Sequence, residues 1–297
     1  MIKFSLVVPF FLTKKDDRTS YMNELLCSLP DRADLEVLLV DDHSEFDYEQ
    51  ENPFEQTKLI RIDNNIGKKF AGSARNAGIC KSRGDYLIFA DSDDMFCCQN
   101  FSAALDSVYD NQDEDIVVCR ATSFIEDGKI GTRHLYADNL ISKFNQTGDP
   151  HDLIPFHGPW AKIIRKSFVM KHMVEFGETR LANDVLFNVK LMLASPRIRV
   201  FEDTIYRIRQ GNSSLTNDPS WSAIKIRLAV ARQVHELLIL AGRPDLRSPL
   251  HYQYQKYFKA FPIKTFAEFV RSLTAGDLVF SPPKKMFSTL SKKVGLY

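Results

Sequence analysis

Short apolar runs recur along the first hundred residues and predict β-strands at residues 4–8, 35–40, 58–62 and 86–90. Between these runs, apolar or small residues return with helical spacing, which predicts helices near residues 19–29 and 70–81. Strands that alternate with helices favour a parallel sheet whose faces are covered by the helices. The first part of the chain is therefore expected to have an α/β fold.

The pattern of the next hundred residues is looser, with a polar stretch that reaches Pro155. The elements predicted around that stretch are a helix near residues 100–109, a strand at 115–119 and two strands at 198–201 and 205–208. We interpret them as the second half of the same domain. The predicted domain covers residues 1–215, with halves 1–95 and 96–215.

Helical periodicity dominates the rest of the chain. One predicted helix begins near Ser222 and ends at Gly242. A second is expected to begin at Thr265, because Thr265 and Glu268 have the spacing of a capping box. Residues 216–297 are thus predicted to form a helical extension.

Charge divides unevenly between these two regions. The chain has a net charge of +1, but residues 216–297 hold 13 Lys and Arg against 5 Asp and Glu, a net +8, so residues 1–215 carry −7. A basic extension suits an anionic surface, either phospholipid or nucleic acid, or is a solvated helical face. No nucleic-acid recognition motif is present, so we expect no nucleic-acid partner.

The end of the chain combines basic and apolar residues after Pro282 and Pro283. Four lysines are interleaved there with Phe287, Leu290, Val294 and Leu296. This spacing predicts a short helix that contacts a membrane surface, although a frayed end would look the same.

Other features of the sequence argue against several classes of protein. The longest apolar stretches fall well short of the roughly 20 residues of a membrane-spanning helix. The amino terminus reads as a strand rather than a secretion signal. Five cysteines without metal-ligand spacing argue against a zinc site or a disulfide framework. We expect a cytoplasmic protein, peripheral on the inner face of the cell membrane if the tail binds lipid.

An acidic cluster follows the apolar run at residues 86–90: Asp91, Ser92, Asp93 and Asp94. A strand that ends in an Asp-x-Asp pair brings two carboxylates to the carboxyl edge of a sheet, where they can share a divalent cation with a diphosphate. The polar turns after Pro9 and at residues 41–42 are expected at the same edge. The alternative is an acidic turn that caps the next helix.

Seven motifs in this order resemble glycosyltransferase family 2, over roughly residues 4–215. They lie at residues 5–9 (Ser-Leu-Val-Val-Pro), 39–44, 72–78, 84–94, 160–162, 183–187 and 206–214. The resemblance implies the glycosyltransferase-A fold: a mostly parallel central sheet flanked by helices, with a Rossmann-like nucleotide-binding half. It also implies an inverting transfer.

On the donor side, the resemblance implies a nucleotide-sugar site made of Pro9, Asp41, Asp42, Arg75, Asp91, Ser92 and Asp93. The Asp42 carboxylate would accept the N3 proton of uracil, unless Asp42 is a capping residue. Arg75 would lie near base and phosphates, unless it forms a surface ion pair. Asp91 and Asp93 would hold Mn²⁺ or Mg²⁺ on the two phosphates.

On the acceptor side, the resemblance makes Asp184 the catalytic base, although Asn183 stands where an acid often precedes it. Capping of a helix is the alternative role of Asp184. Trp160 would pack on a sugar and Lys162 would meet phosphate or acceptor, whereas a core position is more usual for a single Trp. The remaining predicted contacts with phosphate or acceptor are Arg207, Arg209 and Ser213. The alternative is that these three are solvated residues at the edge of a strand.

These features predict a metal-dependent, inverting glycosyltransferase. It would move a hexose or N-acetylhexosamine from a UDP-sugar to a hydroxyl of a growing glycan, such as a polyprenyl-diphosphate-linked O-antigen, capsule or lipopolysaccharide intermediate. The alternative is a non-catalytic module of the same fold that binds a nucleotide sugar or glycan. A P-loop nucleotidase is excluded, because Ser73 follows Gly72 where the motif requires Lys.

Overall fold

The computed structural model describes residues 1–14, 18–46, 52–63, 70–110, 113–125, 128–211, 218–247, 254, 257–258 and 260–274. The chain divides into two compact units, Met1–Asn217 and Asp218–Tyr297. The five cysteines are free. Within the described residues, no helix is both long and apolar enough to cross a membrane.

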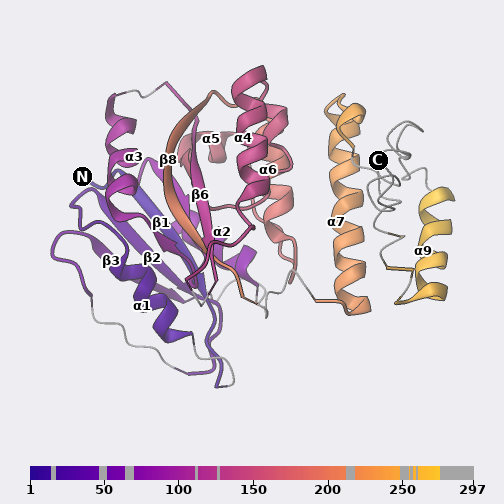
Figure 1. The fold of residues 1–297 in the computed structure, drawn as a ribbon, viewed down its shortest axis with the longest axis horizontal. Helices are drawn as coiled ribbons and strands as arrows, with labels where there is room; N and C mark the ends of the chain where they lie inside the picture. Colours follow the sequence, from indigo (N-terminus) through magenta and orange to yellow (C-terminus); the bar gives the residue numbers. More distant parts are fainter. Residues whose placement is uncertain are drawn as a thin grey trace. The chain divides into compact units, whose positions relative to one another are not determined.

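The first four long strands of the first unit are parallel neighbours in the order β3-β2-β1-β4, of which β3, β2 and β1 are labelled in Figure 1. They are β1 (Phe4–Phe10), β2 (Leu35–Asp41), β3 (Lys58–Asp63) and β4 (Tyr86–Phe89). β1 and β2 are buried along their whole length, as expected for strands covered on both faces. The intervening helices are α1 (Thr19–Cys27) and α2 (Ala71–Lys81), so the predicted α/β alternation is confirmed.

The second half extends the sheet in mixed directions, in the order β3-β2-β1-β4-β7-β6-β8-β5. β7 (Lys162–Arg165) is antiparallel to both β4 and β6. β6 (Ile116–Phe124) is parallel to β8, and β5 (Met95–Phe96) is antiparallel to β8. The complete sheet is therefore mixed, and its four parallel neighbours β3, β2, β1 and β4 all belong to the first half of the domain.

β8 (Ile198–Arg209) is one long strand where the sequence predicted two short ones. Its pairing with β6 shifts register around Arg120, and the polar, exposed residues Glu202 and Asp203 fall in this irregularity. A bulge places extra residues in one strand without ending it. The polar residues between the two predicted strands therefore form a bulge within one continuous strand.

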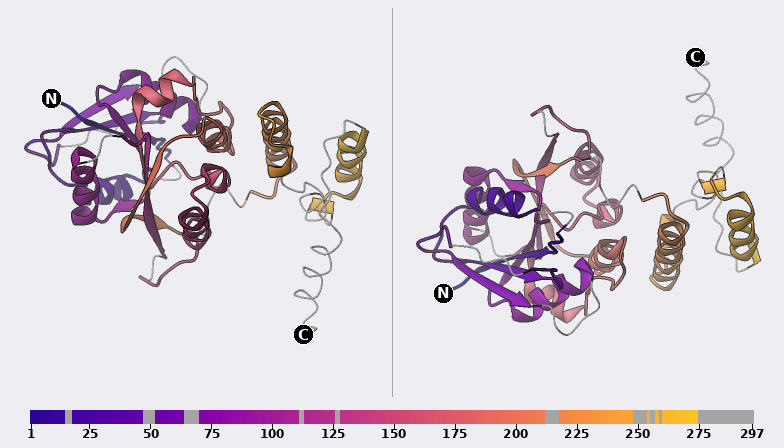
Figure 2. Two further views of the ribbon diagram at one scale, coloured as in Figure 1. Left: turned by 90° about the horizontal axis from the view of Figure 1, so that it is seen from above. Right: turned by 90° about the horizontal axis from the view of Figure 1, so that it is seen from below.

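Helices flank the sheet in the views of Figures 1 and 2. Those of the second half are α3 (Cys98–Asp110), α4 (Leu135–Thr147), the 3₁₀ turn η1 (Pro150–Leu153), α5 (Lys166–Lys171) and α6 (Asn183–Leu193). α4 lies in the stretch interpreted as polar. It buries Ala137, Ile141 and Phe144 and ends at Gly148, whose φ of 68° suits glycine.

Two glycines allow α2 to approach its neighbours closely. A Cβ atom on Gly78 would lie 2.3 Å from Val7 Cγ1, and one on Gly72 would lie 2.1 Å from the carbonyl oxygen of Gly177. Only glycine fits at such distances without displacing the backbone. The close approach fixes α2 against β1 and against the segment that leads into α6.

In the second unit, α7 (Trp221–Leu240) agrees with the predicted helix, and Ser220 caps it by accepting from the Ala223 N–H at 3.2 Å. The 3₁₀ turn η3 (Pro244–Leu246) and α9 (Pro262–Thr274) follow. The predicted capping box is wrong. α9 begins at Pro262, whose fixed φ suits a first turn, and Thr265 is a buried residue inside the helix. The basic tail from Pro282 onward lies outside the described residues.

Candidate functional site

The acidic cluster lies directly after β4 and presents two carboxylates to solvent. The side chains of Asp91 and Asp93 are 31% and 33% exposed, on either side of Ser92, whereas Asp94 is only 2% exposed. β5 separates the cluster from α3, so these residues are not the cap of the next helix. Two carboxylates are thus available to a ligand, and the third belongs to the protein interior.

Asp94 ties the cluster to β8. Its Oδ2 accepts from the Tyr206 hydroxyl at 2.8 Å, and its Oδ1 accepts from the Arg209 N–H at 2.7 Å. The Tyr206 oxygen in turn accepts from the Asp91 N–H at 3.0 Å. Burial raises the pKa of Asp94 well above its usual value, and the negative charges of Asp91 and Asp93 raise it further. Asp94 therefore holds the loop that carries the other two acids.

Replacement of Tyr206 by Phe is expected to lower the free energy of unfolding by about 1–3 kcal/mol, because it leaves a buried Asp94 oxygen without its donor. Urea unfolding measures this effect. Tyr109→Phe is the matched control. The Tyr109 hydroxyl donates to Asp34 at 2.7 Å in an exposed position, so its loss should cost less than about 1 kcal/mol. Equal losses would contradict the anchoring role of Asp94.

Arg75 connects the acidic cluster to the start of α6. It is buried on α2, donates through Nη2 to Asp91 and through Nη1 to Asn183 Oδ1 at 2.8 Å, and lies 5.3 Å from the ring centroid of Phe176. The alternative of a surface ion pair is therefore excluded. Asn183, at the position where an acid often stands, serves as a neutral acceptor for this guanidinium.

Asp184 lies in the first turn of α6, beside the Arg75 contact. The residue before this helix, Ala182, adopts a left-handed conformation with φ of 56° and occupies the cap position, where its methyl group makes no capping hydrogen bond. Neither Asn183 nor Asp184 is thus a capping residue. Burial raises the pKa of Asp184, Arg75 opposes this shift and Asp91 adds to it, so Asp184 shares one electrostatic environment with the cluster.

Trp160 and Lys162 are packed inside the protein. The Trp160 ring is parallel to the Tyr206 ring, with centroids 5.9 Å apart. The Lys162 ammonium is buried, donates to the carbonyl oxygens of Phe156 (3.0 Å) and Gly158, and lies 3.5 Å from the Phe156 ring centroid. Burial lowers the pKa of Lys162 to about 7, although the Asp184 charge opposes the shift. Both side chains therefore support the site from within.

Asp41 and Asp42 lie at the carboxyl end of β2, next to β1, where Pro9 and Phe10 pair with Val40 and Asp41. The Asp41 carboxylate accepts from Arg61 Nη2 at 2.8 Å and from the Ser44 N–H at 2.8 Å. Asp42 is buried, and its N–H donates to the Phe10 carbonyl at 2.8 Å. The parallel strands thus bring these residues to the sheet edge that carries the acidic cluster.

The predicted phosphate contacts at the end of β8 pack against aromatic rings, and the Arg209 side chain is only 10% exposed and pairs with Glu24. Arg209 Nε donates to the Asp93 carbonyl at 2.9 Å, and its guanidinium lies 4.2 Å from the Tyr21 ring centroid. The Arg207 guanidinium lies 4.9 Å from the Phe124 ring centroid. Ser213 lies outside the described residues.

Arg18 also belongs to the site, although its sequence position did not predict this: its Nη1 lies 3.1 Å from Asp93 Oδ2. Asp93 has both a negative neighbour, Asp91, and a positive one, Arg18. Burial raises its pKa, the Asp91 charge raises it further, and Arg18 lowers it. Arg18 and Asp93 lie 75 positions apart in the sequence, so their interaction becomes visible only in the folded structure.

The carboxylates of Asp91 and Asp93 suit a hard divalent cation. Within the described part of the chain, no group of three or more His, Cys, Asp or Glu side chains is placed to hold a metal ion. The two carboxylates are partly exposed, and the Asp91 charge raises the cost of charge on Asp93, a cost that a cation would offset. The remaining ligands would come from the substrate and water.

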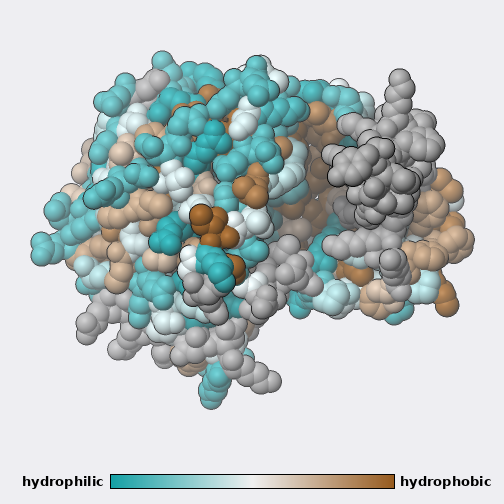
Figure 3. All heavy atoms as spheres, viewed as in Figure 1, coloured by the Kyte–Doolittle hydropathy of each residue, from teal (hydrophilic) through white to brown (hydrophobic). Residues whose placement is uncertain are grey.

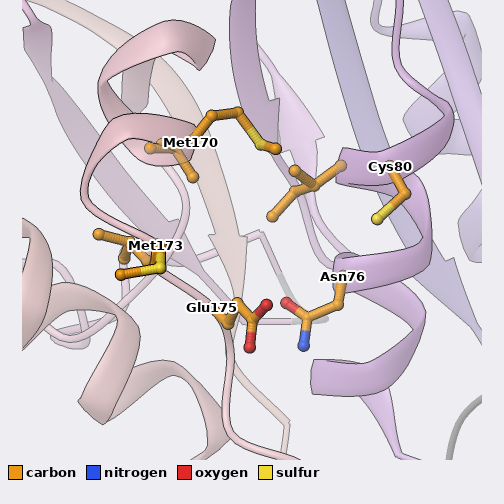
Figure 4. A pocket seen from close by; sticks show the side chains of 8 residues that line it. Asn76, Cys80, Met170, Met173 and Glu175 are labelled. Carbon is orange, nitrogen blue, oxygen red and sulfur yellow. The ribbon is translucent and has the colours of Figure 1, made fainter.

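A separate hollow of about 130 Å³ lies between α2 and α5 (Figure 4). Its lining is mostly apolar and includes Asn76, Cys80, Met170, Met173 and Glu175. None of the predicted site residues lines it, and an apolar hollow does not suit a diphosphate. The chemistry is thus better placed at the carboxyl edge of the sheet.

Sequence comparison relates the chain to known glycosyltransferases. The family described as glycosyl transferase family 2 matches residues 5–173, more than half of the chain. The poly(ribitol-phosphate) β-N-acetylglucosaminyltransferase TarP of Staphylococcus aureus strain N315 is 26% identical over 220 residues, covering 70% of this chain and 63% of TarP. The uncharacterized glycosyltransferase EpsJ of Bacillus subtilis strain 168 is 25% identical over 224 residues, covering 72% of this chain and 63% of EpsJ. The match spans less than two thirds of either relative.

Solved structures share the fold. Residues 1–349 of S. aureus TarS, crystallised with UDP-GlcNAc, superpose with a TM-score of 0.61 at 21% identity, covering 80% of this chain and 67% of that one. The mannosyltransferase PcManGT of Pyrobaculum calidifontis, solved with GDP-Man and Mn²⁺, gives a TM-score of 0.56 at 15% identity, covering 99% and 81%. These likenesses confirm the predicted glycosyltransferase-A fold.

Proposed function

The chain belongs to glycosyl transferase family 2, and from this premise we propose that it is a metal-dependent, inverting glycosyltransferase. One observation carries the proposal: Arg75 connects Asp91, in the acid cluster after β4, to Asn183, beside Asp184 at the start of α6. A donor held by the first group and an acceptor activated by the second would meet at this edge of the sheet.

The proposed donor is a UDP-sugar that carries a hexose or N-acetylhexosamine. Support comes from TarP, named a β-N-acetylglucosaminyltransferase, and from TarS, crystallised with UDP-GlcNAc. In this chain, Asp42 would accept the N3 proton of uracil, and Pro9 and Asp41 would shape the base site beside it. Arg75, Arg207, Arg209 and Ser213 would offset charge on the phosphates.

Asp91 and Asp93 would hold Mn²⁺ or Mg²⁺ on the diphosphate, with Ser92 between them. When bound, the ion would take up negative charge that develops on the departing diphosphate. Arg75 orients the Asp91 carboxylate, and Asp94 fixes the loop through Tyr206. These contacts keep both ligands in place before substrate arrives.

Asp184 is the proposed base. Its carboxylate would take the proton of the acceptor hydroxyl while that oxygen bonds to the anomeric carbon and the bond from this carbon to the diphosphate breaks. A single displacement inverts the configuration. A carboxyl group with a raised pKa accepts a proton more readily than an ordinary Asp, which suits the role. Buried Lys162 and Trp160 would support the acceptor side.

The proposed acceptor is a hydroxyl of a growing surface glycan, carried on a lipid such as a polyprenyl diphosphate in O-antigen, capsule or lipopolysaccharide synthesis. Residues 1–95 would bind most of the donor, and residues 96–215 would bind the acceptor and add Arg207, Arg209 and Ser213 to the phosphate site. The basic extension 216–297 and its tail would hold the enzyme peripherally on the inner face of the membrane, because their positive charge suits anionic lipid.

A donor screen tests this function. We expect UDP release from one UDP-sugar, in the presence of a glycan acceptor, to require Mn²⁺ or Mg²⁺ and to stop when EDTA removes the ion. Product mass and NMR would give the transferred sugar and its inverted anomeric configuration. Donor binding without turnover with any acceptor would instead favour the non-catalytic module, and turnover in EDTA would remove the metal role of Asp91 and Asp93.

A further inference from the structure

Helix α9 has its two faces inverted relative to an ordinary surface helix. It buries the polar residues Thr265 and Ser272. Four of its large apolar residues are exposed instead: Ile263 by 84%, Phe266 by 58%, Val270 by 40% and Leu273 by 53%. We refer to these four residues as the apolar stripe. Soluble helices normally bury such a stripe, so another surface is expected to cover it.

Specific contacts fix this orientation of α9. Arg232 on α7 donates through Nη2 to Glu268 Oε2 at 2.8 Å and to Ser272 Oγ at 2.8 Å. The Tyr254 hydroxyl lies 2.6 Å from Ser272 Oγ, and Phe269 packs on the small core around Tyr254. Rotating α9 to bury the stripe would break these bonds. The exposed stripe is therefore a property of the packed unit.

The stripe is narrow and has basic residues on one flank. At 100° per residue, its four positions fall within about 80° of the helix circumference. Lys264 and Arg271 lie together beside it, about 80–100° from Ile263 on the same scale. Figure 3 shows apolar residues along α9, which Figure 1 locates. Apolar residues bordered by cations are typical of a helix that lies in a lipid interface.

Charge indicates which surface the stripe meets. Residues 216–297 carry a net +8, whereas the preceding residues carry −7. If two copies met stripe to stripe, their basic units would repel each other, whereas an anionic bilayer would attract the unit. We propose that the apolar stripe of α9 binds an anionic lipid bilayer, with the helix parallel to the membrane plane. This inference does not depend on the transfer reaction.

Vesicle cosedimentation of the full-length protein tests the proposal. The unsubstituted chain should bind phosphatidylcholine vesicles that contain phosphatidylglycerol and bind pure phosphatidylcholine weakly. The triple variant Ile263→Ser, Phe266→Ser, Leu273→Ser should lose at least about tenfold in the partition coefficient, because burial of apolar area drives insertion. Its unfolding curve should remain unchanged, since the substituted side chains are exposed. Unchanged binding of this variant would overturn the proposal.

Three further variants make the result specific. The matched control Met170→Ser, Met173→Ser removes exposed apolar side chains from the first unit and should bind normally. Lys264→Glu, Arg271→Glu should weaken binding only to anionic vesicles, and less so at high salt. Substitution of the four tail lysines by Gln tests the tail. Binding lost in the tail variant but kept in the stripe variant, or a stripe-dependent dimer in sedimentation velocity that binds no vesicles, would refute the assignment to α9.

Discussion

Asp184→Asn is expected to lower kcat about 10²- to 10⁴-fold, the usual contribution of a general base, while UDP affinity stays largely unchanged. The amide keeps the size of the side chain but cannot take the acceptor proton. Single-turnover transfer and calorimetric titration with UDP measure the two effects separately. Weakened UDP binding with normal transfer at saturation would show that Asp184 acts on the donor instead.

The pH dependence gives an independent test of the same residue. Burial raises the pKa of Asp184 above the usual 3.8, so its carboxylate gains a proton while the solution is still less acidic than an ordinary Asp would require. Transfer should therefore decline as pH falls through this raised pKa, and the decline should be smaller in the residual activity of Asp184→Asn, where the raised pKa of Asp93 still contributes to it. Asp203→Asn, in the exposed bulge of β8, is the matched control and should transfer normally.

Asp93→Asn should produce the other large loss, at least about tenfold in kcat, together with a rise in the Mn²⁺ concentration that gives half-maximal transfer. An amide oxygen is a weaker ligand than a carboxylate, and its neutrality leaves the ion less well compensated. Metal titrations of transfer and of donor binding measure this change.

Asp85→Asn is the matched control for Asp93. Asp85 lies just before β4, at the end of the strand opposite the acidic cluster, and forms an exposed pair with Lys3 at 3.0 Å. Such pairs contribute little to stability, so this variant should keep the metal response of the unsubstituted chain. A metal response in Asp93→Asn equal to that of Asp85→Asn would refute the metal role.

Local pattern was sufficient to predict the first half of the fold. β1 and β4 are apolar runs, β3 combines apolar and charged residues, and α2 has Gly78 where it meets β1, so each segment carries its own signal. The long α7, ending before Gly242, was predicted for the same reason. The parallel direction of these strands followed from the alternation of strands and helices, without knowledge of which strands pair.

The second half could not be read in this way. β7 inserts antiparallel between β4 and β6, a choice made by long-range pairing. α4 has only three buried positions in a polar sequence, and β8 continues through a bulge. At α9, the spacing of Thr265 and Glu268 suggested a cap, but Pro262 and the contacts of Arg232 determine where the helix starts and which way it faces.

For the site, the family motifs pointed to Arg75, Asp91 and Asp184, whose roles remain predictions. In the structure, Arg75 donates to Asp91 and to Asn183, the residue before Asp184. Three interactions had no local signal because they join distant segments: Arg18 with Asp93, Tyr206 with Asp94, and Arg75 with Asn183. Their sequence separations are 75, 112 and 108 residues.

The anchoring of Asp94 affects how mutational surveys of this protein should be read. A survey scored only by enzymatic turnover would rank Asp91, Asp93 and Asp94 as equivalent, because substitution of any one of them should lower the measured activity. Pairing that score with a measure of folded abundance would separate them: substitutions at Asp94 should deplete the folded population, whereas those at Asp93 should leave abundant but inactive protein.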